Sequence, residues 1–258
     1  AVSGGGDINN DRTEDYIVGA PYHDDGATDA GAVYVFNGSS FAQITKLKGQ
    51  AIGDRFGWAV AMLGQVNSDS NADFIVGAPF HDNTGGANAG KVYVYSGSNF
   101  AKIGIKTGAN PNDHFGKAVA GPGKLDSDTR ADFVVAAPLC DALGQANAGK
   151  VYAYSGFTFA VLWKANGAAP DDQFGLTLAG AGDVNGDGLG EVAVAAPYND
   201  AAANNAGRVQ VRSGLNGAVI HAFNGAAAGD QFGIALSGIG GLNEEDRARV
   251  AIGAAYSE

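Results

Sequence analysis

Short apolar runs alternate with polar, glycine-rich segments along the whole chain. In one representative stretch, residues 56–62 form an apolar run rich in small side chains, and residues 74–79 form a second run that ends at a proline. Two further runs, 90–95 and 100–105, are separated by a Ser-Gly-Ser hairpin signal. No stretch keeps a sustained apolar period of 3.6 residues. The pattern therefore predicts four short strands per unit and almost no helix.

This unit returns every 58 or 59 residues. Its marker is a Phe-Gly pair that begins at Phe56, Phe115, Phe174 and Phe232. A single unit of this size cannot bury both of its faces alone, so the period indicates one repeat array. We expect a single array over residues 1–258, with repeats at 1–47, 48–107, 108–166 and 167–224 and a partial repeat at 225–258. Both ends fall inside a unit, which leads us to expect a longer array.

Four antiparallel strands per unit, joined by tight turns, predict an all-β fold of the β-propeller type, with four four-stranded blades and part of a fifth. The first strand carries small residues at alternate positions, such as Ala118 and Ala120, which suits an innermost strand crowded around an axis. The third strand is apolar on both faces, with valines on one and Tyr93 and Tyr95 on the other. A sheet stacked between two neighbours needs this pattern.

The fourth unit departs from the others in its third strand, where Gln210 and Arg212 replace the tyrosines. We expect this face to meet water or a polar partner. The fifth unit stops before its own third and fourth strands, so we expect the missing surface to come from more of the same polypeptide or from a second copy. In the second case the contacts would be head-to-tail, with Gln210 and Arg212 at or near the junction.

The composition limits the classes of partner that we expect the chain to bind. The formal net charge of −11 argues against nucleic acid, whose recognition needs basic patches, and suits divalent cations or basic partners. The single cysteine, Cys140, excludes an internal disulfide. No apolar run approaches the roughly 18 residues of a membrane-spanning helix, so we expect no membrane insertion.

An acidic loop joins the first two strands of each unit. Ca²⁺ takes about six to eight oxygen ligands, and alternate residues of a tight loop can all point inward. Positions 1, 3, 5 and 9, with a backbone carbonyl at position 7, therefore predict a compact cage. The first loop supplies Asp7, Asn9, Asp11 and Asp15, with Thr13 at the carbonyl position. The fourth loop supplies Asp183, Asn185, Asp187 and Glu191, with Leu189 at the carbonyl position.

The ligand pattern weakens in the remaining loops. The second loop has Gln65, Asn67, Asp69 and Asp73, and the third has Lys124 in first place, followed by Asp126, Asp128 and Asp132. The fifth has Gly241, Asn243, Glu245 and Arg249, and its closing cation should exclude a metal. The alternative is that these Asp and Asn side chains cap turns. Their fixed register before an apolar strand favours the metal interpretation for the first, second and fourth loops, and both interpretations stay open for the third.

Together these features resemble the FG-GAP repeats of integrin α-chain propellers and related bacterial surface proteins. The resemblance rests on the Phe-Gly pairs, on Gly-Ala-Pro at 19–21 and 77–79 and on the acidic loops between them; Ala-Ala-Pro replaces this motif at 136–138 and 195–197. It covers nearly the whole chain. It implies a β-propeller with Ca²⁺ in the loops between first and second strands, and an extracellular or cell-surface adhesion or scaffolding role.

We therefore expect a calcium-binding, non-enzymatic module that binds a protein or glycan ligand. In this family ligands dock on the face opposite the metals, which here would carry residues 22–30, 80–89, 139–148 and 198–206 and the segments 49–55, 108–114, 167–173 and 225–231. Two alternatives stay open. One is a structural subunit of a surface layer or filament, and the other is an accessory domain of a secreted hydrolase.

The sequence offers little for catalysis. The neighbours His23-Asp24 and His81-Asp82 are the best acid–histidine candidates, but adjacent residues of an extended chain point to opposite sides. Cys140 has no evident base, and neither a nucleophile elbow nor a pair of catalytic carboxylates is present in the sequence. We therefore expect no enzymatic activity.

Overall fold

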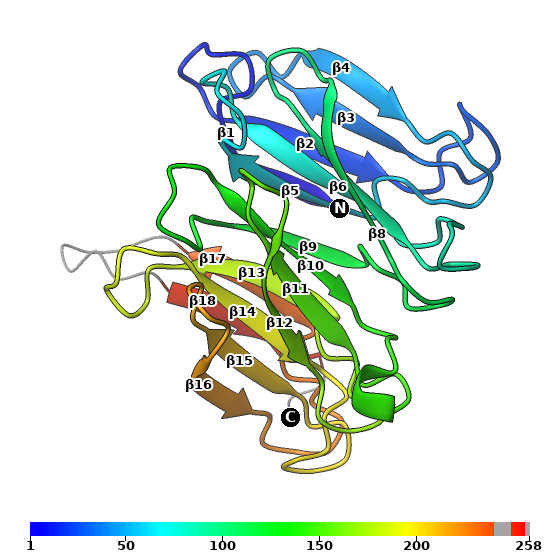
Figure 1. The fold of residues 1–258 in the computed structure, drawn as a ribbon, viewed down its shortest axis with the longest axis vertical. Coiled ribbons are helices and arrows are strands. Elements are labelled where there is room, and N and C mark those ends of the chain that lie inside the picture. Colours follow the sequence, from blue (N-terminus) through cyan, green and yellow to red (C-terminus); the bar gives the residue numbers. More distant parts are fainter. Residues whose placement is uncertain (240–248, 256–258) are drawn as a thin grey trace. The chain divides into compact units, whose positions relative to one another are not determined.

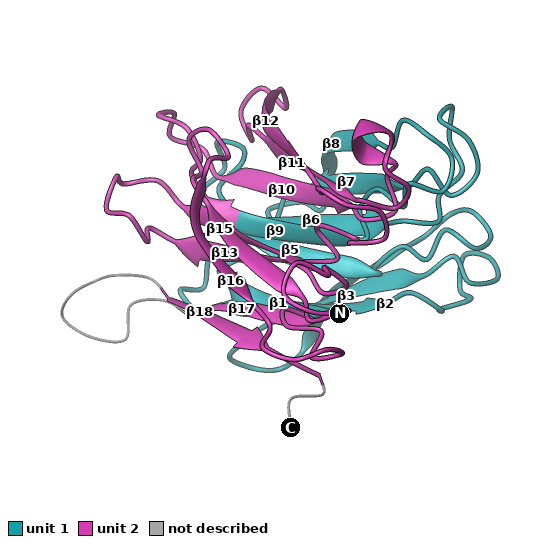
Figure 2. Cartoon of the chain, turned by 90° about the horizontal axis from the view of Figure 1, so that it is seen from below, with its two compact units in different colours: residues 1–121 teal, residues 122–258 magenta. Residues whose placement is uncertain are grey.

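The computed structural model describes residues 1–239 and 249–255. Its regular elements in these ranges are strands and one short 3₁₀ turn, η1 (Ala142–Gly144) (Figure 1). The chain divides into two compact units, Ala1–Gly121 and Pro122–Glu258 (Figure 2). Each is described by itself below. No helix in the described ranges is long and apolar enough to cross a bilayer.

Unit 1 contains two four-stranded antiparallel sheets whose strand order follows the chain. The first sheet consists of β1 (Val2–Gly6), β2 (Asp15–Ala20), β3 (Ala32–Phe36) and β4 (Gln43–Lys48). The second consists of β5 (Ala59–Gly64), β6 (Asp73–Ala78), β7 (Lys91–Tyr95) and β8 (Lys102–Thr107). β1 lies beside β5, so the first strands of the two sheets are neighbours.

Unit 2 holds the later repeats. The third sheet consists of β9 (Ala118–Gly123), in which the boundary between the units falls, β10 (Asp132–Ala137), β11 (Lys150–Tyr154) and β12 (Val161–Asn166). The fourth consists of β13 (Thr177–Gly182), β14 (Glu191–Ala196), β15 (Arg208–Arg212) and β16 (Val219–Asn224). A pair, β17 (Ala235–Ile239) and β18 (Arg249–Gly253), follows. These sheets are the expected blades, so the predicted all-β propeller fold class is confirmed.

The two sequence motifs meet at a close backbone contact. A Cβ atom placed on Gly19, in the first Gly-Ala-Pro segment, would lie 2.0 Å from the carbonyl oxygen of Gly57, in the first Phe-Gly pair. Gly57 also has a φ of 89°, which side chains disfavour, and its N–H donates to the carbonyl of Gly77 (3.0 Å). Both motifs therefore require glycine because two backbones touch there.

The faces of the second sheet explain its apolar third strand. Val92 and Val94 are almost fully buried, and Tyr95 on the other face is 7% exposed. Phe56 packs edge-on against Tyr93 and Tyr95, with ring centroids 5.5 and 6.1 Å apart. The Phe-Gly segment thus covers the tyrosine face of its own repeat, as expected for a sheet buried on both sides.

The fourth sheet shows what its polar face contacts. Arg212 is half-buried: its guanidinium carbon lies 5.2 Å from the ring centroid of Phe174, and its Nε donates to Gln210 Oε1 (2.9 Å). Arg212 on the polar face therefore packs partly against the Phe-Gly segment of its own repeat, within unit 2. On the opposite face, Val211 belongs to an apolar cluster that Leu236 and Val250 of the last strand pair cover.

Candidate metal-binding loops

Each of the first four acidic loops closes with a buried carboxylate that is also the first residue of the second strand. These residues are at most 1% exposed: Asp15, Asp73, Asp132 and Glu191. In each case one carboxylate oxygen accepts the backbone N–H of the second loop position. The donors are, in chain order, Ile8 (2.9 Å), Val66 (2.8 Å), Leu125 (2.6 Å) and Val184 (2.7 Å). The closing carboxylate thus fixes the start of its own loop.

The same carboxylates hold the hairpin between the third and fourth strands. Asp15, Asp73 and Asp132 each accept the N–H of a turn glycine through their other oxygen, at 2.9, 3.0 and 2.8 Å from Gly38, Gly97 and Gly156. The N–H of Gly214 hydrogen-bonds to Glu191 in the fourth repeat. Sequence reasoning missed this link. Its signal was the Asn-Gly or Ser-Gly pair that recurs at the same register in every hairpin.

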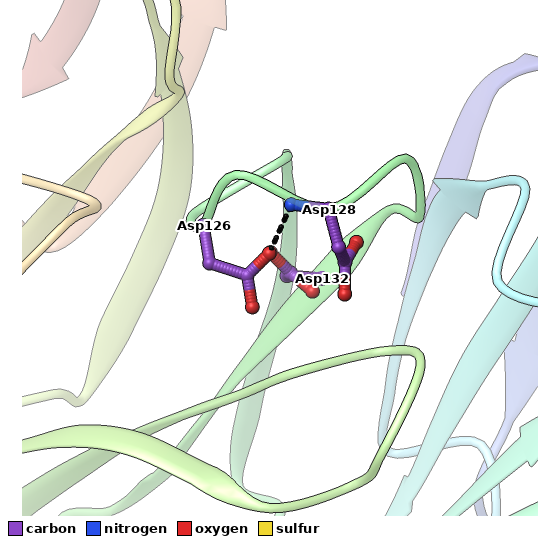
Figure 3. A group of neighbouring side chains, drawn as sticks. All are labelled: Asp126, Asp128 and Asp132. Carbon is purple, nitrogen blue, oxygen red and sulfur yellow. Dashed lines mark hydrogen bonds between the residues drawn. The ribbon is translucent and has the colours of Figure 1, made fainter.

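The third loop brings three carboxylates together. One oxygen atom from each of Asp126, Asp128 and Asp132 lies within 4.8 Å of the others, and Figure 3 shows the three side chains gathered in the loop. The Asp128 N–H donates to Asp126 Oδ1 (2.8 Å), which orients the first two. Within the described ranges, this is the one place where at least three acidic, histidine or cysteine side chains converge in this way.

The electrostatics of the third loop suit a cation. Burial raises the pKa of Asp132, the N–H groups of Gly156 and Leu125 oppose the rise, and the charges of Asp126 and Asp128 add to it, which leaves the pKa at about 6. Lys124, at the first loop position, is exposed, and its carbonyl accepts the N–H of Gly190 (2.8 Å). The carboxylates therefore crowd negative charge at a point that oxygen-seeking Ca²⁺ would relieve.

The first loop directs its oxygens onto its own backbone. Asp7 accepts the N–H groups of Asp11 (3.1 Å) and Arg12 (2.7 Å), and Asp11 accepts that of Thr13 (2.8 Å). Asn9 Oδ1 accepts the Asp11 N–H (2.9 Å). The Asn37 side-chain amide donates to Asp11 and is the main cause of that carboxyl's lowered pKa. These contacts are the turn caps of the alternative interpretation, formed by the predicted ligand side chains.

The fourth loop repeats the arrangement. Asp183 accepts the N–H groups of Gly186 (2.6 Å) and Gly188 (2.8 Å). Asp187 accepts the Leu189 N–H (2.9 Å), and the Asn185 amide donates to Asp187 (2.9 Å) and to Glu191 Oε1 (3.1 Å). Burial raises the pKa of Glu191, and its N–H donors oppose that rise. Asn185 is thus the residue that joins the middle of this loop to its closing carboxylate.

The second loop is bound to the hairpin by hydroxyl groups. Ser96 and Ser98 donate to Asp69 Oδ2, at 2.7 and 2.5 Å, and the Asn67 amide donates to the same oxygen (2.9 Å). Burial acts to raise the pKa of Asp69, but the two hydroxyls, the Asn71 N–H and the Asn67 amide together outweigh it and lower the pKa to about 2. Gln65, in first place, donates to the carbonyl of Ser70 (3.2 Å). Of the fifth loop, Gly241, Asn243 and Glu245 lie outside the described residues.

The histidine–acid neighbours do not form couples. His81 Nδ1 lies 2.7 Å from Asp54 Oδ2, while Asp82 accepts the N–H of Asn88 (2.8 Å). His23 Nδ1 accepts the N–H of Asp25 (3.0 Å). The His81–Asp54 pair was missed because its members are 27 residues apart.

An aromatic cluster forms on the loops of unit 1 from Tyr22, Trp58, Phe80 and His114. Two cations lie against it: the Arg55 guanidinium carbon is 4.3 Å from the Phe80 ring centroid, and Lys117 Nζ is 3.6 Å from that of Trp58. Burial, and then the charge of Arg55, lowers the pKa of Lys117 to about 8. The predicted ligand-face segments 22–30 and 80–89 include Tyr22 and Phe80, but sequence reasoning missed Trp58 and Lys117, each of which directly follows a Phe-Gly pair.

Comparison with known proteins agrees with this architecture. The family described as "FG-GAP repeat" matches residues 56–95 and 174–211. The chain therefore contains FG-GAP repeats, and its β-propeller fold is similar to that of integrin α chains. It is 31% identical over 206 residues to integrin alpha-5 of Xenopus laevis, which covers 74% of this chain and 19% of that relative. It is 30% identical over 207 residues to integrin alpha-V of Gallus gallus, with the same coverage.

The match concerns one part of these relatives. The chain spans about a fifth of the length of the curated relatives it matches. Integrin alpha-11 of Mus musculus is 34% identical over 199 residues, which is 71% of this chain and 16% of that relative. Among solved structures, the Dos1 propeller has a TM-score of 0.48 at 12% identity, and the alignment covers 86% of this chain and 46% of that one.

Proposed function

We propose that this chain is a calcium-binding β-propeller module of an extracellular or cell-surface protein. It would act in adhesion by binding a protein or glycan ligand, without catalysis. The observation that carries the metal part is the convergence of Asp126, Asp128 and Asp132 within 4.8 Å. Three carboxylates on one loop supply the hard oxygen ligands that Ca²⁺ prefers, and their mutual repulsion favours a divalent cation.

The four loops would share this role through equivalent positions. The third loop would hold Ca²⁺ through its three aspartates. The proposed ligands in the others are Asp7, Asn9, Asp11, Asp15 and the Thr13 carbonyl; Asn67, Asp69 and Asp73; and Asp183, Asn185, Asp187, Glu191 and the Leu189 carbonyl. Each carboxylate oxygen has two lone pairs, so an oxygen that accepts one N–H can still contribute to a cation.

The ligand side of the proposal rests on the aromatic cluster and on the similarity to integrin α chains. Tyr22 is 57% exposed, and Arg55 lies 4.9 Å from its ring centroid. Exposed aromatic side chains next to arginine are typical of the energetic centres of protein interfaces. We therefore place the ligand on the loops that carry Tyr22 and Phe80, and we expect an extracellular partner.

Calorimetry of metal-free protein tests the calcium proposal. Titrated Ca²⁺ should bind with a stoichiometry above one, and Asp128→Asn should remove one of the sites. The matched control is Asp141→Asn, which makes the same charge change in the same repeat at an exposed side chain that caps Asn147. The proposal would be contradicted if no heat of binding were measured at millimolar Ca²⁺. It would also be contradicted if the two variants changed the calcium stoichiometry equally.

Self-association is a second candidate, favoured by one surface. The last strand of the fourth sheet, β16, is largely exposed, with Val219 at 47% and Phe223 at 46%. A second copy that covered this strand would bury both side chains. Sedimentation at rising concentration, with Phe223→Ser as the comparison, distinguishes an assembling subunit from a monomeric binder.

A further inference from the structure

A cavity of about 220 Å³ lies in unit 1, between β4 of the first sheet and the β7–β8 pair of the second. Its buried surface is formed by Asp54, Phe56 and Tyr95, and Tyr93 and Phe100 are half-buried. Lys102 is exposed at its edge. At about 30 Å³ per water molecule, this space is about that of seven waters, which suits a ligand of one ring. The acidic loops contribute no residue to it.

The walls offer ring faces and a hydroxyl donor. Phe56 meets Tyr93 and Tyr95 edge-on, so these rings are held in place by one another. Burial, and then the charge of Asp54, raises the pKa of Tyr93 to about 12, so its hydroxyl keeps its proton near neutral pH. Flat apolar walls with a few placed polar groups are the usual make-up of small-molecule sites.

Two charged side chains of opposite sign line the cavity, and one is buried while the other is exposed. The Asp54 side chain is 8% exposed and is held by His81, whose Nδ1 lies 2.7 Å from Oδ2. Lys102 Nζ lies 5.6 Å from the ring centroid of Tyr93. The other lysine at the edge, Lys48, is paired with Asp25 at 2.7 Å. The cavity therefore presents a hydrogen-bond acceptor in its depth and a cation near its opening.

The equivalent place in the fourth repeat shows that blade packing alone does not create this space. There the cavity is about 40 Å³, and its lining includes Asp172, Phe174 and Gln210. Gln210 takes the position of Tyr93, and Arg212 takes that of Tyr95 and lies over Phe174. The larger cavity is thus the one lined by two tyrosines, and the fourth repeat holds a smaller counterpart without them.

We propose that this cavity binds a hexuronic acid, either free or as the end unit of an acidic glycan. The C–H face of the sugar ring packs on Tyr93 and Phe56, a ring hydroxyl donates to Asp54, and the sugar carboxylate pairs with Lys102. His81 already occupies Asp54 Oδ2, and a purely apolar ligand would offer no donor to the other carboxylate oxygen. A neutral sugar would leave Lys102 without an anion. The site does not depend on the calcium proposal, because its lining and the acidic loops share no residue.

Sodium D-glucuronate is the probe, titrated in chelator and followed by calorimetry and by ligand-observed NMR. We expect saturable binding, and binding of D-glucose about tenfold weaker because it lacks the carboxylate. Lys102→Gln should weaken glucuronate binding about tenfold, which corresponds to about 1.4 kcal/mol. Lys150→Gln is the matched control, because Lys150 Nζ lies 5.4 Å from the Tyr152 ring centroid and so loses a similar contact outside the cavity. It should change the dissociation constant less than twofold.

A second variant tests the walls. Tyr93→Gln installs the residue of the fourth repeat at a half-buried position and should abolish binding while the thermal melt remains cooperative. The proposal is overturned if glucuronate does not bind at tens of millimolar, or if Lys102→Gln and Lys150→Gln bind alike. Tighter binding of 4-hydroxybenzoate than of glucuronate would also overturn it, because the cavity would then select an aromatic acid. Since all titrations contain chelator, these outcomes are separate from the fate of the calcium proposal.

Discussion

Gly77 and Gly116 lie so close that a Cβ atom on Gly77 would stand 2.1 Å from the carbonyl oxygen of Gly116. The two glycines belong to the Gly-Ala-Pro segment of the second repeat and to the next Phe-Gly pair. A methyl group cannot fit unless one backbone moves. The paired motifs are therefore a steric requirement of stacked sheets in unit 1.

Gly77→Ala should consequently destabilise the protein by about 1–3 kcal/mol, as overpacking in a closed core does. Gly4→Ala is the control, because a Cβ there would meet only ordinary contacts at 3.7 and 3.8 Å. Urea unfolding followed by tryptophan fluorescence measures both. Equal midpoints for the two variants would show that the backbones separate at little cost.

Asp73→Ala should lower the melting temperature strongly. The substitution leaves the N–H groups of Val66, Asn67 and Gly97 without their acceptor, and each buried donor left unpaired costs about 1–3 kcal/mol. A loss of about 3 kcal/mol corresponds to about 6–12 °C for a chain of this size. Asp82→Ala, which removes an exposed carboxylate with one backbone contact, should shift the melt far less. The comparison should be made in chelator, so that no metal contributes.

Ca²⁺ should raise the melting temperature, because a ligand that binds only the folded state adds RT ln(1+[L]/Kd) to its stability. Asp11→Ala and Asp187→Ala should each lower the calorimetric stoichiometry by up to one site, since each removes a mid-loop carboxylate. Mg²⁺ at the same concentration should stabilise less, because it demands near-ideal octahedral geometry and gives up its waters reluctantly. Identical melts in Ca²⁺ and in chelator would count against all four cages.

Lys117 should make stability rise with pH in the alkaline range. Its pKa in the folded protein is about 8, below the ordinary 10.5, because burial and then Arg55 disfavour its charge. Between these two values the unfolded chain binds more protons than the folded one, so the free energy of unfolding increases with pH. Lys117→Gln should remove this rise of the free energy of unfolding with pH. The readout is the difference in melting temperature between the two proteins at pH 7.5 and pH 10, and a difference independent of pH would contradict the assignment.

Much of the fold could be predicted from local pattern. The Phe-Gly spacing and the strand alternation gave four sheets and a strand pair, because glycine contacts and two-sided burial leave a periodic trace in sequence. The role of the closing Asp73 could be predicted only in part. Its partners in the loop are close in sequence, but Gly97, whose N–H it also accepts, is 24 residues away. The contact of Arg212 with Phe174 could not be predicted, since an arginine that packs on a ring and an arginine in water look alike in sequence.

The candidate site was harder to predict, because ligand counting ignores what the oxygens already accept. By residue type, the first and fourth loops supply the most ligands. The carboxylates nevertheless converge in the third loop, where Lys124 has replaced the first acid and Asp126 and Asp128 lie beside Asp132. Which of these side chains turn toward backbone N–H groups depends on loop torsions that residue types alone do not determine.

The buried closing carboxylate gives each blade an internal brace that does not require a cation in the loop. Because Asp73 and Asp132 bind the loop start and the hairpin in the same way, whether Gln65 or Lys124 begins the loop, each blade keeps its internal brace when the residue at the first proposed ligand position changes. Repeats in one array can therefore drift to different metal affinities without losing their shape. A propeller built in this way could hold a graded series of ion sites, tuned one blade at a time.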